Sequence, residues 1–400
     1  MKENLAVVRG HYFSHEELKL YEFLTDKFNV TFISSIKGTA GTVGNIKVVE
    51  IPCLDGILNG IGLGNLFRKV EGLVNNLIGV DLELMFQLRK ALRDFSIVHT
   101  IDYNYVLTYQ LALLKKELKY KLVTTHWENI PFARDKKLIS RKMKYFVYDN
   151  IDAFFAMSER AKASLLLEGV PESRIYVTYY GVDTRRFRPD NKAYLEVREQ
   201  FRLSPDDVVL LFIGRIRSSK GIFELIYATK RLIDDPSIPK EHIKVIIAGR
   251  GPQERELDKT IRSLGLQNNV IRIGFIPHSE IHNIHNMADI FVLPSIPRKY
   301  WQEQLGFVLL EAMACGKPVV STLSGSIPEI VGDAGILVQP NDHLSLYTAL
   351  KRLITEPNLL LYLSDASLKE VQEKFTLSCI SNKMKAAYTE LQRKDSYGQT

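Results

Sequence analysis

Residues 208–232 have the sequence VVLLFIGRIRSSKGIFELIYATKRL. The apolar run from Val208 to Ile213 has the length and the branched side chains of a buried strand. A glycine turn and a basic loop follow it, and apolar residues at helical spacing start at Ile222. A strand, a turn and a helix in this order form the repeating element of a parallel sheet covered by helices.

The same alternation occurs along most of the chain. In the first half, strand-sized apolar runs lie at Leu5–Val8, Val30–Ser34, Ile97–Thr100, Leu122–Thr125 and Ala153–Met157. In the second half, after Val208–Ile213, they lie at Lys244–Ala248, Val270–Gly274, Ile290–Leu293, Pro318–Ser321 and Ile336–Val338. Because helical-period segments separate these runs, the sequence predicts an α/β fold with two parallel sheets.

The 400 residues exceed what one hydrophobic core usually organises, so we expect two domains. A polar, turn-prone stretch between Tyr180 and Asn191 separates the two halves. We therefore predict domains at 1–188 and 189–375, followed by a helical tail, 376–400, that packs back on the N-terminal domain. Ligands in such folds bind at the carboxyl ends of the strands, so the expected site is a cleft between the two domains.

The composition excludes several classes of protein. The chain is 46% hydrophobic and 25% charged, far from disordered, collagen-like or coiled-coil sequences. Cys53, Cys315 and Cys379 have no spacing typical of a metal knuckle or redox pair, which favours a reducing compartment. The first residues lack the apolar run of a signal peptide, and no stretch approaches about 20 apolar residues. The expected location is the cytoplasm.

The basic loop after Val208–Ile213 is a candidate anion site. Gly214 allows a tight turn, and Arg215 and Lys220 bring two cations to the start of the following helix. Backbone N–H groups and fixed positive charge converge at such a place and suit a diphosphate. The alternative is a solvated basic loop, which this segment alone does not exclude.

A second candidate element is WQEQLGFVLLEAMACGKPVV, residues 301–320. A helix that starts near Gly306 presents its first N–H groups to an anion, and Glu303 lies on the loop before it. Glu311 lies inside this otherwise apolar helix, so its carboxylate needs a partner. That partner is either a residue of the fold or a hydroxyl group of a ligand.

Further motifs occur in a fixed order around these two elements: Ala248-Gly249-Arg250-Gly251-Pro252, Gly274-Phe275-Ile276, Ala288–Ser295 and Ile327–Val331. Together with Gly-Arg-x-x-x-x-Lys-Gly at 214–221 and the glutamates at 303 and 311, they resemble the retaining glycosyltransferases of family 4. The resemblance implies the GT-B fold, in which two Rossmann-like domains face each other across a cleft. It also implies an acceptor-binding N-terminal domain and a nucleotide-sugar-binding C-terminal domain.

The resemblance assigns roles to individual residues. Arg215 and Lys220 would stabilise the charge of the departing diphosphate, the type of term that usually dominates catalysis. Glu311 would accept hydrogen bonds from the ribose, Glu303 would face the donor sugar, and Ile276 would lie against the base. The remaining residues expected at the donor are Gly10, His126, Gly214, Gly249, Gly306, Phe307 and Val308. Among these, His126 follows a strand and would orient the donor sugar, and Gly10 would let the backbone approach the donor.

The same residues favour one mechanism, whereas they do not determine the donor base, the sugar or the acceptor. Glu303 is the only candidate nucleophile for double displacement, and its position in the family binds hydroxyls, so same-face substitution is favoured. No Asp-x-Asp pair occurs, which favours catalysis without a metal. The nucleotide sugar, GDP-mannose or UDP-glucose, is a substrate, and no cofactor is expected. The alternative is an inactive nucleotide-sugar-binding or regulatory protein of the same fold.

The net charge of +7 is concentrated between Lys115 and Lys144. Residues 134–146 combine cations with apolar residues at helical spacing, as in a helix lying on an anionic membrane. The apolar segment Ile57–Val80 would add contact, and the acceptor would be a saccharide or a lipid-linked molecule at the inner membrane face. The alternative is an ordinary solvated helix face. A nucleic-acid partner is not expected, because it would leave the glutamate pair unexplained.

Three histidines, His278, His282 and His285, have a spacing that suggests a zinc site. Ile281, Ile284 and Ala288 would form the apolar face of the same helix. We therefore expect the histidines to be solvated or to cap the helix.

Overall fold

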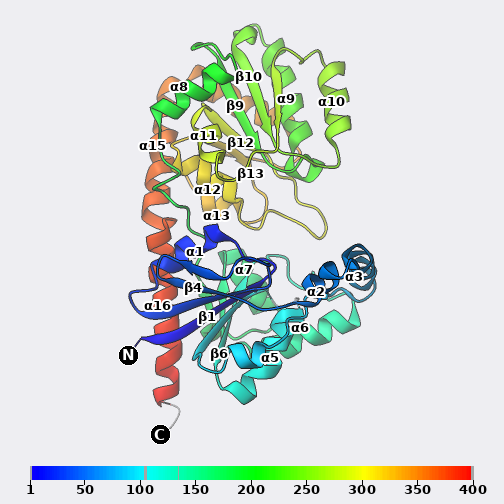
Figure 1. Ribbon diagram of the computed structural model, residues 1–400. Coiled ribbons are helices and arrows are strands. Elements are labelled where there is room, and N and C mark those ends of the chain that lie inside the picture. The colour runs from blue at the N-terminus through cyan, green and yellow to red at the C-terminus, as the bar shows by residue number, and fades with distance from the viewer. Residues whose placement is uncertain (1, 103–105, 134, 398–400) are drawn as a thin grey trace. The chain divides into compact units, whose positions relative to one another are not determined.

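The computed structural model describes residues 2–102, 106–133 and 135–397, which form two compact units (Figure 1). Unit 1 comprises the chain up to Gly181 together with the segment from Leu377 onward, and unit 2 comprises Val182–Thr376. The contacts thus divide the chain a few residues away from the boundaries expected from the sequence, 188/189 and 375/376.

Unit 1 is built on an eight-stranded sheet with the order β3-β4-β2-β1-β5-β6-β7-β8. All neighbours are parallel except β3 and β4, which form an antiparallel pair. The five strands predicted from the sequence are confirmed, whereas β3, β4 and β8 were not predicted. The bounds are β1 (Glu3–Gly10), β2 (Phe28–Ser34), β3 (Gly41–Val43), β4 (Ile46–Glu50), β5 (Ile97–Ile101), β6 (Lys121–His126), β7 (Ala153–Ala156) and β8 (Ile175–Val177).

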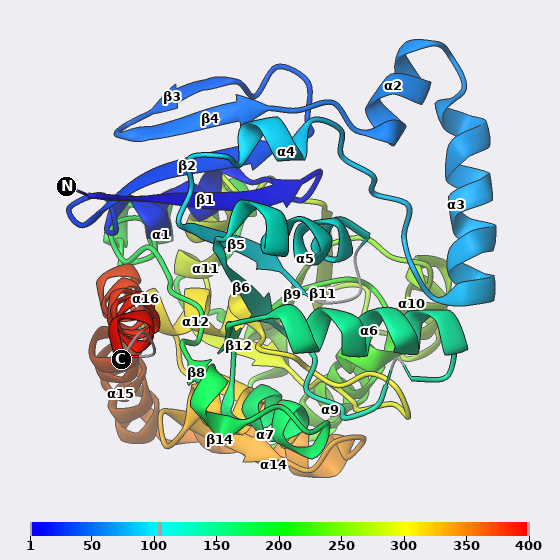
Figure 2. The same cartoon turned by 90° about the horizontal axis from the view of Figure 1, so that it is seen from below.

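Helices cover both faces of this sheet (Figure 2). Alternate residues of β1 show the two faces: Ala6 and Val8 pack with α5, α6 and α7, whereas Leu5 and Val7 pack with α1 and α16. All four are fully buried, as expected for a central parallel strand. The helices are α1 (His15–Glu22), α2 (Leu54–Gly60), α3 (Gly64–Ile78), α4 (Leu88–Ala91), α5 (Val106–Leu118), α6 (Leu138–Asn150), α7 (Glu159–Leu167) and α16 (Leu377–Tyr397).

Helix α16 belongs to unit 1, although unit 2 separates it from the rest of that unit in sequence. Its Ile380 and Tyr388 are fully buried in the same core as Phe28 and Phe155 of the sheet. The Tyr388 hydroxyl also hydrogen-bonds to the buried ring of His99 on β5. One face of the sheet is therefore closed by residues that come after unit 2 in the chain.

Unit 2 is built on a six-stranded parallel sheet with the order β11-β10-β9-β12-β13-β14. All six predicted strands are present: β9 (Val208–Ile213), β10 (Ile243–Ala248), β11 (Val270–Gly274), β12 (Ile290–Leu293), β13 (Val319–Thr322) and β14 (Gly335–Val338). Helices α9, α10 and α14 pack together, and α12 packs with α11, α13 and α15. The helices are α8 (Asn191–Gln200), α9 (Ile222–Asp234), α10 (Glu254–Ser263), α11 (Ile281–Asn286), α12 (Phe307–Ala314), α13 (Ile327–Val331), α14 (His343–Thr355) and α15 (Pro357–Lys374).

The strand order fixes where each unit can bind a ligand. In unit 2 the order reverses direction between β9 and β12, and in unit 1 it reverses between β1 and β5. Loops on the two sides of such a reversal leave the sheet in opposite directions and open a crevice at the carboxyl ends of the strands. Within the described residues, no helix is long and apolar enough to cross a membrane.

Candidate functional site

The reversal point of unit 2 is lined by the loops that follow β9 and β12. These loops touch at Gly221, where a Cβ atom would lie 1.8 Å from the carbonyl oxygen of Pro294. Gly221 also has a φ of +70°, a conformation that side chains rarely adopt. Only glycine fits here, and the close approach brings Lys220 and Glu303 to the same place.

Lys220 and Glu303 form an ion pair. The Lys220 ammonium donates to Glu303 Oε2 at 2.7 Å and to Oε1 at 3.0 Å, and it lies 5.0 Å from the centre of the Trp301 ring. The hydroxyl of Ser295 also donates to Glu303 Oε2, at 2.7 Å. Glu303 is 6% exposed. The two residues were assigned separate roles from the sequence, and the structure joins them into one unit.

The loop after β13 holds the backbone of Glu303. The N–H group of Ser326 donates to the Glu303 carbonyl at 3.0 Å. At Gly325, whose φ is +58°, a Cβ atom would lie 1.9 Å from that carbonyl oxygen. The Glu303 backbone is therefore fixed from one side by β13, while its carboxylate is fixed from the other by Lys220 and Ser295.

Four of the predicted donor-binding residues line one pocket of about 290 Å³ in unit 2: Gly214, Arg215, Gly249 and Ile276. Its glycines are required by close packing, because a Cβ atom at Gly249 would lie 1.9 Å from the Gly214 carbonyl oxygen. The exposed side chain of Phe275 lines the same pocket, which thus combines an apolar wall with cations.

Arg250 is a second arginine in this pocket, and no role was predicted for it from the sequence. The motif at 248–252 that contains Arg250 was noted in the sequence. Its place beside Arg215 could not be predicted, because the sequence does not show that β9 and β10 are neighbours. Because they are, the loops after them place Arg215 and Arg250 on one pocket wall.

Glu311 has its partners within the fold. Its carboxylate accepts from His278 Nε2 at 2.9 Å and from His285 Nε2 at 3.3 Å. Burial raises the pKa of Glu311, but the hydrogen bonds from the two histidines outweigh it and hold the pKa below its usual value. Burial lowers the pKa of His285, so its neutral ring donates from Nε2. The sequence left two kinds of partner open for Glu311, a residue of the fold or a hydroxyl group of a ligand. The structure shows partners within the fold.

The three histidines were expected to be solvated or to cap a helix, and this is wrong for His285. Its ring is fully buried and contacts Glu311. His278 is exposed and lies before α11, and His282 accepts a long hydrogen bond from Arg186. Across the described part of the chain, no group of three His, Cys, Asp or Glu residues is placed to hold a metal ion.

Helix α12 starts where the sequence predicted. Gly306 precedes it with a φ of +76°, and Phe307 and Val308 form its first turn. The N–H groups of a first turn have no acceptor within the helix, and the helix dipole makes this end positive. The end suits an anion next to the Lys220–Glu303 pair.

The two predicted residues of unit 1 lie at the ends of β6 and β1, which are separated in the sheet by β5. His126 is the last residue of β6 and is fully buried, with its ring edge-on to Phe154. Gly10 ends β1 with a φ of +55°, and a Cβ atom there would lie 1.7 Å from Glu83 Oε1. The backbone at Gly10 is thus approached closely by the carboxylate of Glu83.

Only part of the predicted membrane segment 134–146 is exposed. Lys144 is 1% exposed and pairs with Glu168 at 2.9 Å and with Asp135. Its charge is therefore used inside unit 1, and the expectation that Lys144 faces a membrane is wrong. Arg134 lies outside the described residues. The exposed residues of the segment are Lys136, Lys137, Leu138, Ile139, Arg141 and Lys142.

Two family models match the chain. The model described as Glycosyl transferases group 1 matches residues 194–370, and the model described as Glycosyltransferase Family 4 matches residues 55–186. The first match covers the strands and loops that carry Arg215, Lys220, Glu303 and Glu311.

Individual proteins agree with these models. An uncharacterized glycosyltransferase of Methanocaldococcus jannaschii is 27% identical over 263 residues, 64% of this chain and 64% of the relative. A GDP-mannose-dependent alpha-(1-6)-phosphatidylinositol monomannoside mannosyltransferase of Mycolicibacterium smegmatis is 36% identical over 184 residues, 44% of this chain and 46% of the relative. The matched stretches thus span between about half and two thirds of the length of these curated relatives.

Among solved structures, Anabaena HepE in complex with UDP has a TM-score of 0.72 at 17% identity, covering 97% of this chain and 100% of that chain. This likeness shows the GT-B type of fold, with two Rossmann-like units. Both family models describe glycosyltransferases and together match most of the chain, across both units. The protein therefore belongs to glycosyltransferase family 4, the group 1 glycosyl transferases.

Proposed function

We propose that the protein is a retaining glycosyltransferase that moves a hexose from a nucleotide sugar to a saccharide or lipid-linked acceptor. The observation that carries this proposal is the grouping at the carboxyl ends of the unit 2 strands. A pocket with an apolar wall and two arginines lies beside the loop that bears Lys220. An apolar wall suits a nucleobase, and fixed cations suit a diphosphate.

The Lys220–Glu303 pair supports same-face substitution over double displacement. A nucleophilic carboxylate attacks best when its charge is not already neutralised. Both oxygens of Glu303 accept from the Lys220 ammonium, and one also accepts from Ser295. Such a carboxylate is a poor nucleophile and a good acceptor for sugar hydroxyls. The donor phosphate would then help to deprotonate the acceptor hydroxyl, while Arg215 and Lys220 stabilise the negative charge of the departing diphosphate.

The donor is proposed to be GDP-mannose or UDP-glucose, used without a metal. The mycobacterial relative is GDP-mannose-dependent by name, and HepE, a protein of similar fold, is solved in complex with UDP, so both bases are tested. Thermal unfolding with UDP, GDP and ADP sugars, each with and without EDTA, tests both points. A ligand at about 100 times its Kd stabilises a protein by about 2.7 kcal/mol. Stabilisation that disappears with EDTA would contradict metal independence.

The alternative, an inactive nucleotide-sugar-binding protein, differs in turnover. Release of UDP or GDP from a stabilising donor, and the anomeric configuration of the product by NMR, separate the two. Release with retained configuration supports the transferase. Donor binding without transfer of the sugar to an acceptor or to water would favour the inactive protein. A product with inverted anomeric configuration would contradict the proposed mechanism.

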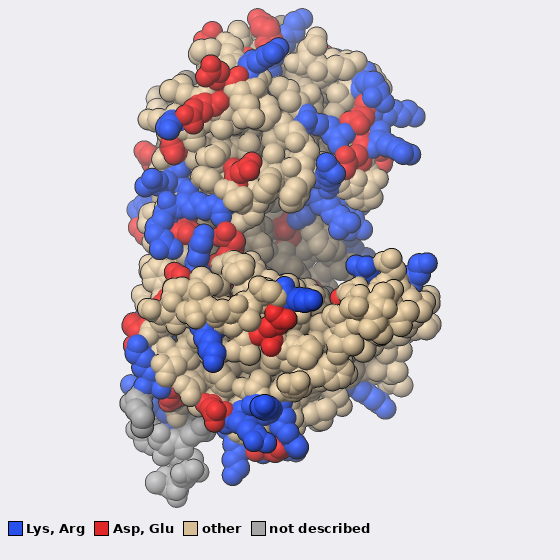
Figure 3. All heavy atoms as spheres, in the orientation of Figure 1, with Lys and Arg blue, Asp and Glu red and all other residues tan. Residues whose placement is uncertain are grey.

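The proposal includes binding to an anionic membrane through α2, α3 and the start of α6. The apolar side chains on this surface are more than a third exposed: Ile57, Ile61, Leu63, Leu66, Val70, Leu73, Leu77, Leu138 and Ile139. The face over α2 and α3 in Figure 3 is largely uncharged, with cations at its margin. Helices α3 and α6 are in contact, and Lys137 donates to the Asn76 carbonyl at 2.9 Å. Exposed leucines next to cations are typical of surfaces that lie on anionic lipid.

Co-sedimentation with vesicles tests this surface. We expect binding to phosphatidylglycerol vesicles and much less to phosphatidylcholine vesicles. Leu73→Ser with Leu77→Ser should reduce the bound fraction several-fold, whereas Leu195→Ser, at a similarly exposed leucine of α8, should not change it. Equal binding by all variants would contradict the membrane assignment and leave the donor site unaffected.

A further inference from the structure

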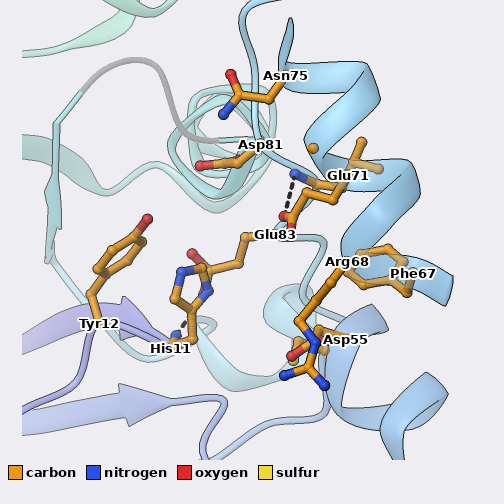
Figure 4. Close-up of a pocket in the computed structure, with 12 residues that line it drawn as sticks. His11, Tyr12, Asp55, Phe67, Arg68, Glu71, Asn75, Asp81 and Glu83 are labelled. Atoms are coloured by element: carbon orange, nitrogen blue, oxygen red, sulfur yellow. Dashed lines mark hydrogen bonds and ion pairs between the residues drawn. The ribbon is translucent and has the colours of Figure 1, made fainter. Parts of the chain in front are cut away.

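Unit 1 contains a pocket of about 430 Å³ at the reversal point of its sheet, beside the end of β1 (Figure 4). The volume lies within the range typical of small-molecule sites. The residues that line it come from four separate segments: the loop after β1, the start of α2, the middle of α3, and the stretch between α3 and α4. None of them was predicted from the sequence to line a binding pocket.

Acidic side chains dominate this pocket. Four carboxylates line it, Asp55, Glu71, Asp81 and Glu83, against one arginine and one histidine. Arg68 donates to Asn65, and the ring of His11 pairs with Glu83 at 2.9 Å. The lining is therefore negative even when His11 is protonated, although the whole chain carries +7.

Three of the carboxylates keep an oxygen that has no hydrogen-bond partner among the residues that the structure describes. Glu83 is 4% exposed; its Oε1 accepts from the His11 backbone at 2.6 Å, and its Oε2 has no partner. Asp81 Oδ1 accepts from the Val106 N–H group at 2.9 Å, and its Oδ2 has no partner. Asp55 Oδ1 is also buried and has no hydrogen-bond partner among the described residues. Burial of an unpaired carboxylate oxygen is costly, so these atoms favour a hydrogen-bond donor that the described residues do not supply.

Glu83 and Asp81 also repel each other. Burial raises the pKa of Asp81 to about 6, and the neighbouring charge of Glu83 contributes to the rise. A ligand hydroxyl can supply a hydrogen bond but does not relieve this repulsion. An ammonium group supplies both a positive charge and three donors. The side chains of Tyr12 and Phe67, which lie on opposite sides of the view in Figure 4, provide apolar surface for the rest of the ligand.

We propose that this pocket binds an ammonium group of the acceptor, so that the acceptor class is an amino sugar or a similar aminated polyol. The identity of the ligand as acceptor rests on the proposed transferase function, whereas its binding to unit 1 does not. Asp81 and Glu83 would hold the ammonium, and Gly10 leaves the space that lets Glu83 approach the end of β1.

The test uses the full chain and two probes that share the hexose ring, D-glucosamine and N-acetyl-D-glucosamine, in titrations followed by calorimetry or NMR at pH 7. Acetylation removes the positive charge. We expect glucosamine to bind at least about tenfold more tightly, as for hydrogen bonds to charged groups. Glu83→Gln and Asp81→Asn should each weaken glucosamine binding by about tenfold or more. Asp94→Asn, which removes an exposed carboxylate of unit 1 outside the pocket, should change it less than twofold.

Acid should also weaken binding. Between pH 7 and pH 5, Asp81 loses most of its charge, and Glu83 raises the pKa of His11 despite burial and so favours the charged form of its ring. Glu71, Asp55 and Arg68 are the other charged groups that face the pocket, and the probe stays an ammonium. Equal affinity for both probes, no glucosamine binding, or unchanged affinity in Glu83→Gln would each overturn the proposal. Donor binding, measured separately with a nucleotide sugar, reports on the transferase function and should be unchanged in both pocket variants.

Discussion

Replacing Lys220 by methionine separates the two tasks that its ammonium performs, stabilising Glu303 and binding the donor. Two opposite charges 2.7 Å apart attract by about 6 kcal/mol at an effective dielectric constant of about 20. Not all of this is lost on substitution, because the Lys220 side chain is 23% exposed, so that water already screens part of the attraction, and because Ser295 still donates to Glu303. Loss of one partner of a buried pair typically costs 3 to 5 kcal/mol, so we expect about 2 to 3 kcal/mol here.

The assay combines thermal unfolding with donor turnover. For a unit of this size, 1 kcal/mol shifts Tm by about 2 to 4 °C, so Lys220→Met should lower Tm by about 4 to 12 °C. Transfer should fall by about 100-fold to 1,000-fold, as when one transition-state donor is removed. Lys230→Met is the matched control, because Lys230 pairs with Asp234 on the exposed face of α9. This substitution should lower the free energy of unfolding by less than about 1 kcal/mol.

A double variant decides between the two tasks. Glu303→Gln in the Lys220→Met background removes the uncompensated charge, so most of the stability should return while transfer stays low. If transfer returned together with stability, Lys220 would act only by positioning residue 303. If Lys220→Met cost no more stability than Lys230→Met, the reasoning about a buried pair would be refuted.

Three further outcomes follow from other contacts. Glu311→Gln keeps the shape of the side chain but removes the charge that the histidines stabilise. The donor KM should rise about tenfold, and stability should fall by about 1 to 2 kcal/mol. An unchanged KM would contradict a contact between Glu311 and the ribose. Gly221→Ala should cost several kcal/mol more than Gly265→Ala, because both glycines have a positive φ but only Gly221 faces a carbonyl oxygen at 1.8 Å; equal losses in urea unfolding would show that the loop can shift. Burial, with Arg9 nearby, holds the pKa of His99 well below 6.5, so the unfolded chain binds the extra proton and stability should fall as the pH drops below about 6.5. His99→Asn should be less stable at pH 7.5 and show a flatter profile down to pH 5, and a parallel profile would contradict this.

The strands were predictable because a central strand of a parallel sheet is buried on both faces and appears as a continuous apolar run, as in VVLLFI at 208–213. The hairpin of β3 and β4 was missed because it lies at an edge and is half exposed, although Gly44-Asn45 between Val43 and Ile46 is a turn signal. Strand β8, Ile175–Val177, is too short to show a pattern.

The candidate donor site was predictable where a single loop bears several of its residues, as the loop from Gly214 to Gly221 does. What the sequence could not provide was pairing between distant residues. The separation of Glu311 from His285 is 26 positions, and that of Lys220 from Glu303 is 83. The acidic pocket of unit 1 is the extreme case, because Glu83 lies in an irregular stretch and meets His11 only through the fold.

The position of α16 in the sequence has a consequence for how the protein is made. Unit 2 is one continuous segment and can complete its core as soon as Thr376 has left the ribosome. Unit 1 cannot, because Ile380 and Tyr388 of its core are translated after unit 2. Until then Phe28 and Phe155 lie on an uncovered sheet face, and nascent chains with such a face are prone to aggregation. The growing chain is therefore most dependent on chaperones while its second half is being synthesised, long after its first strands have emerged.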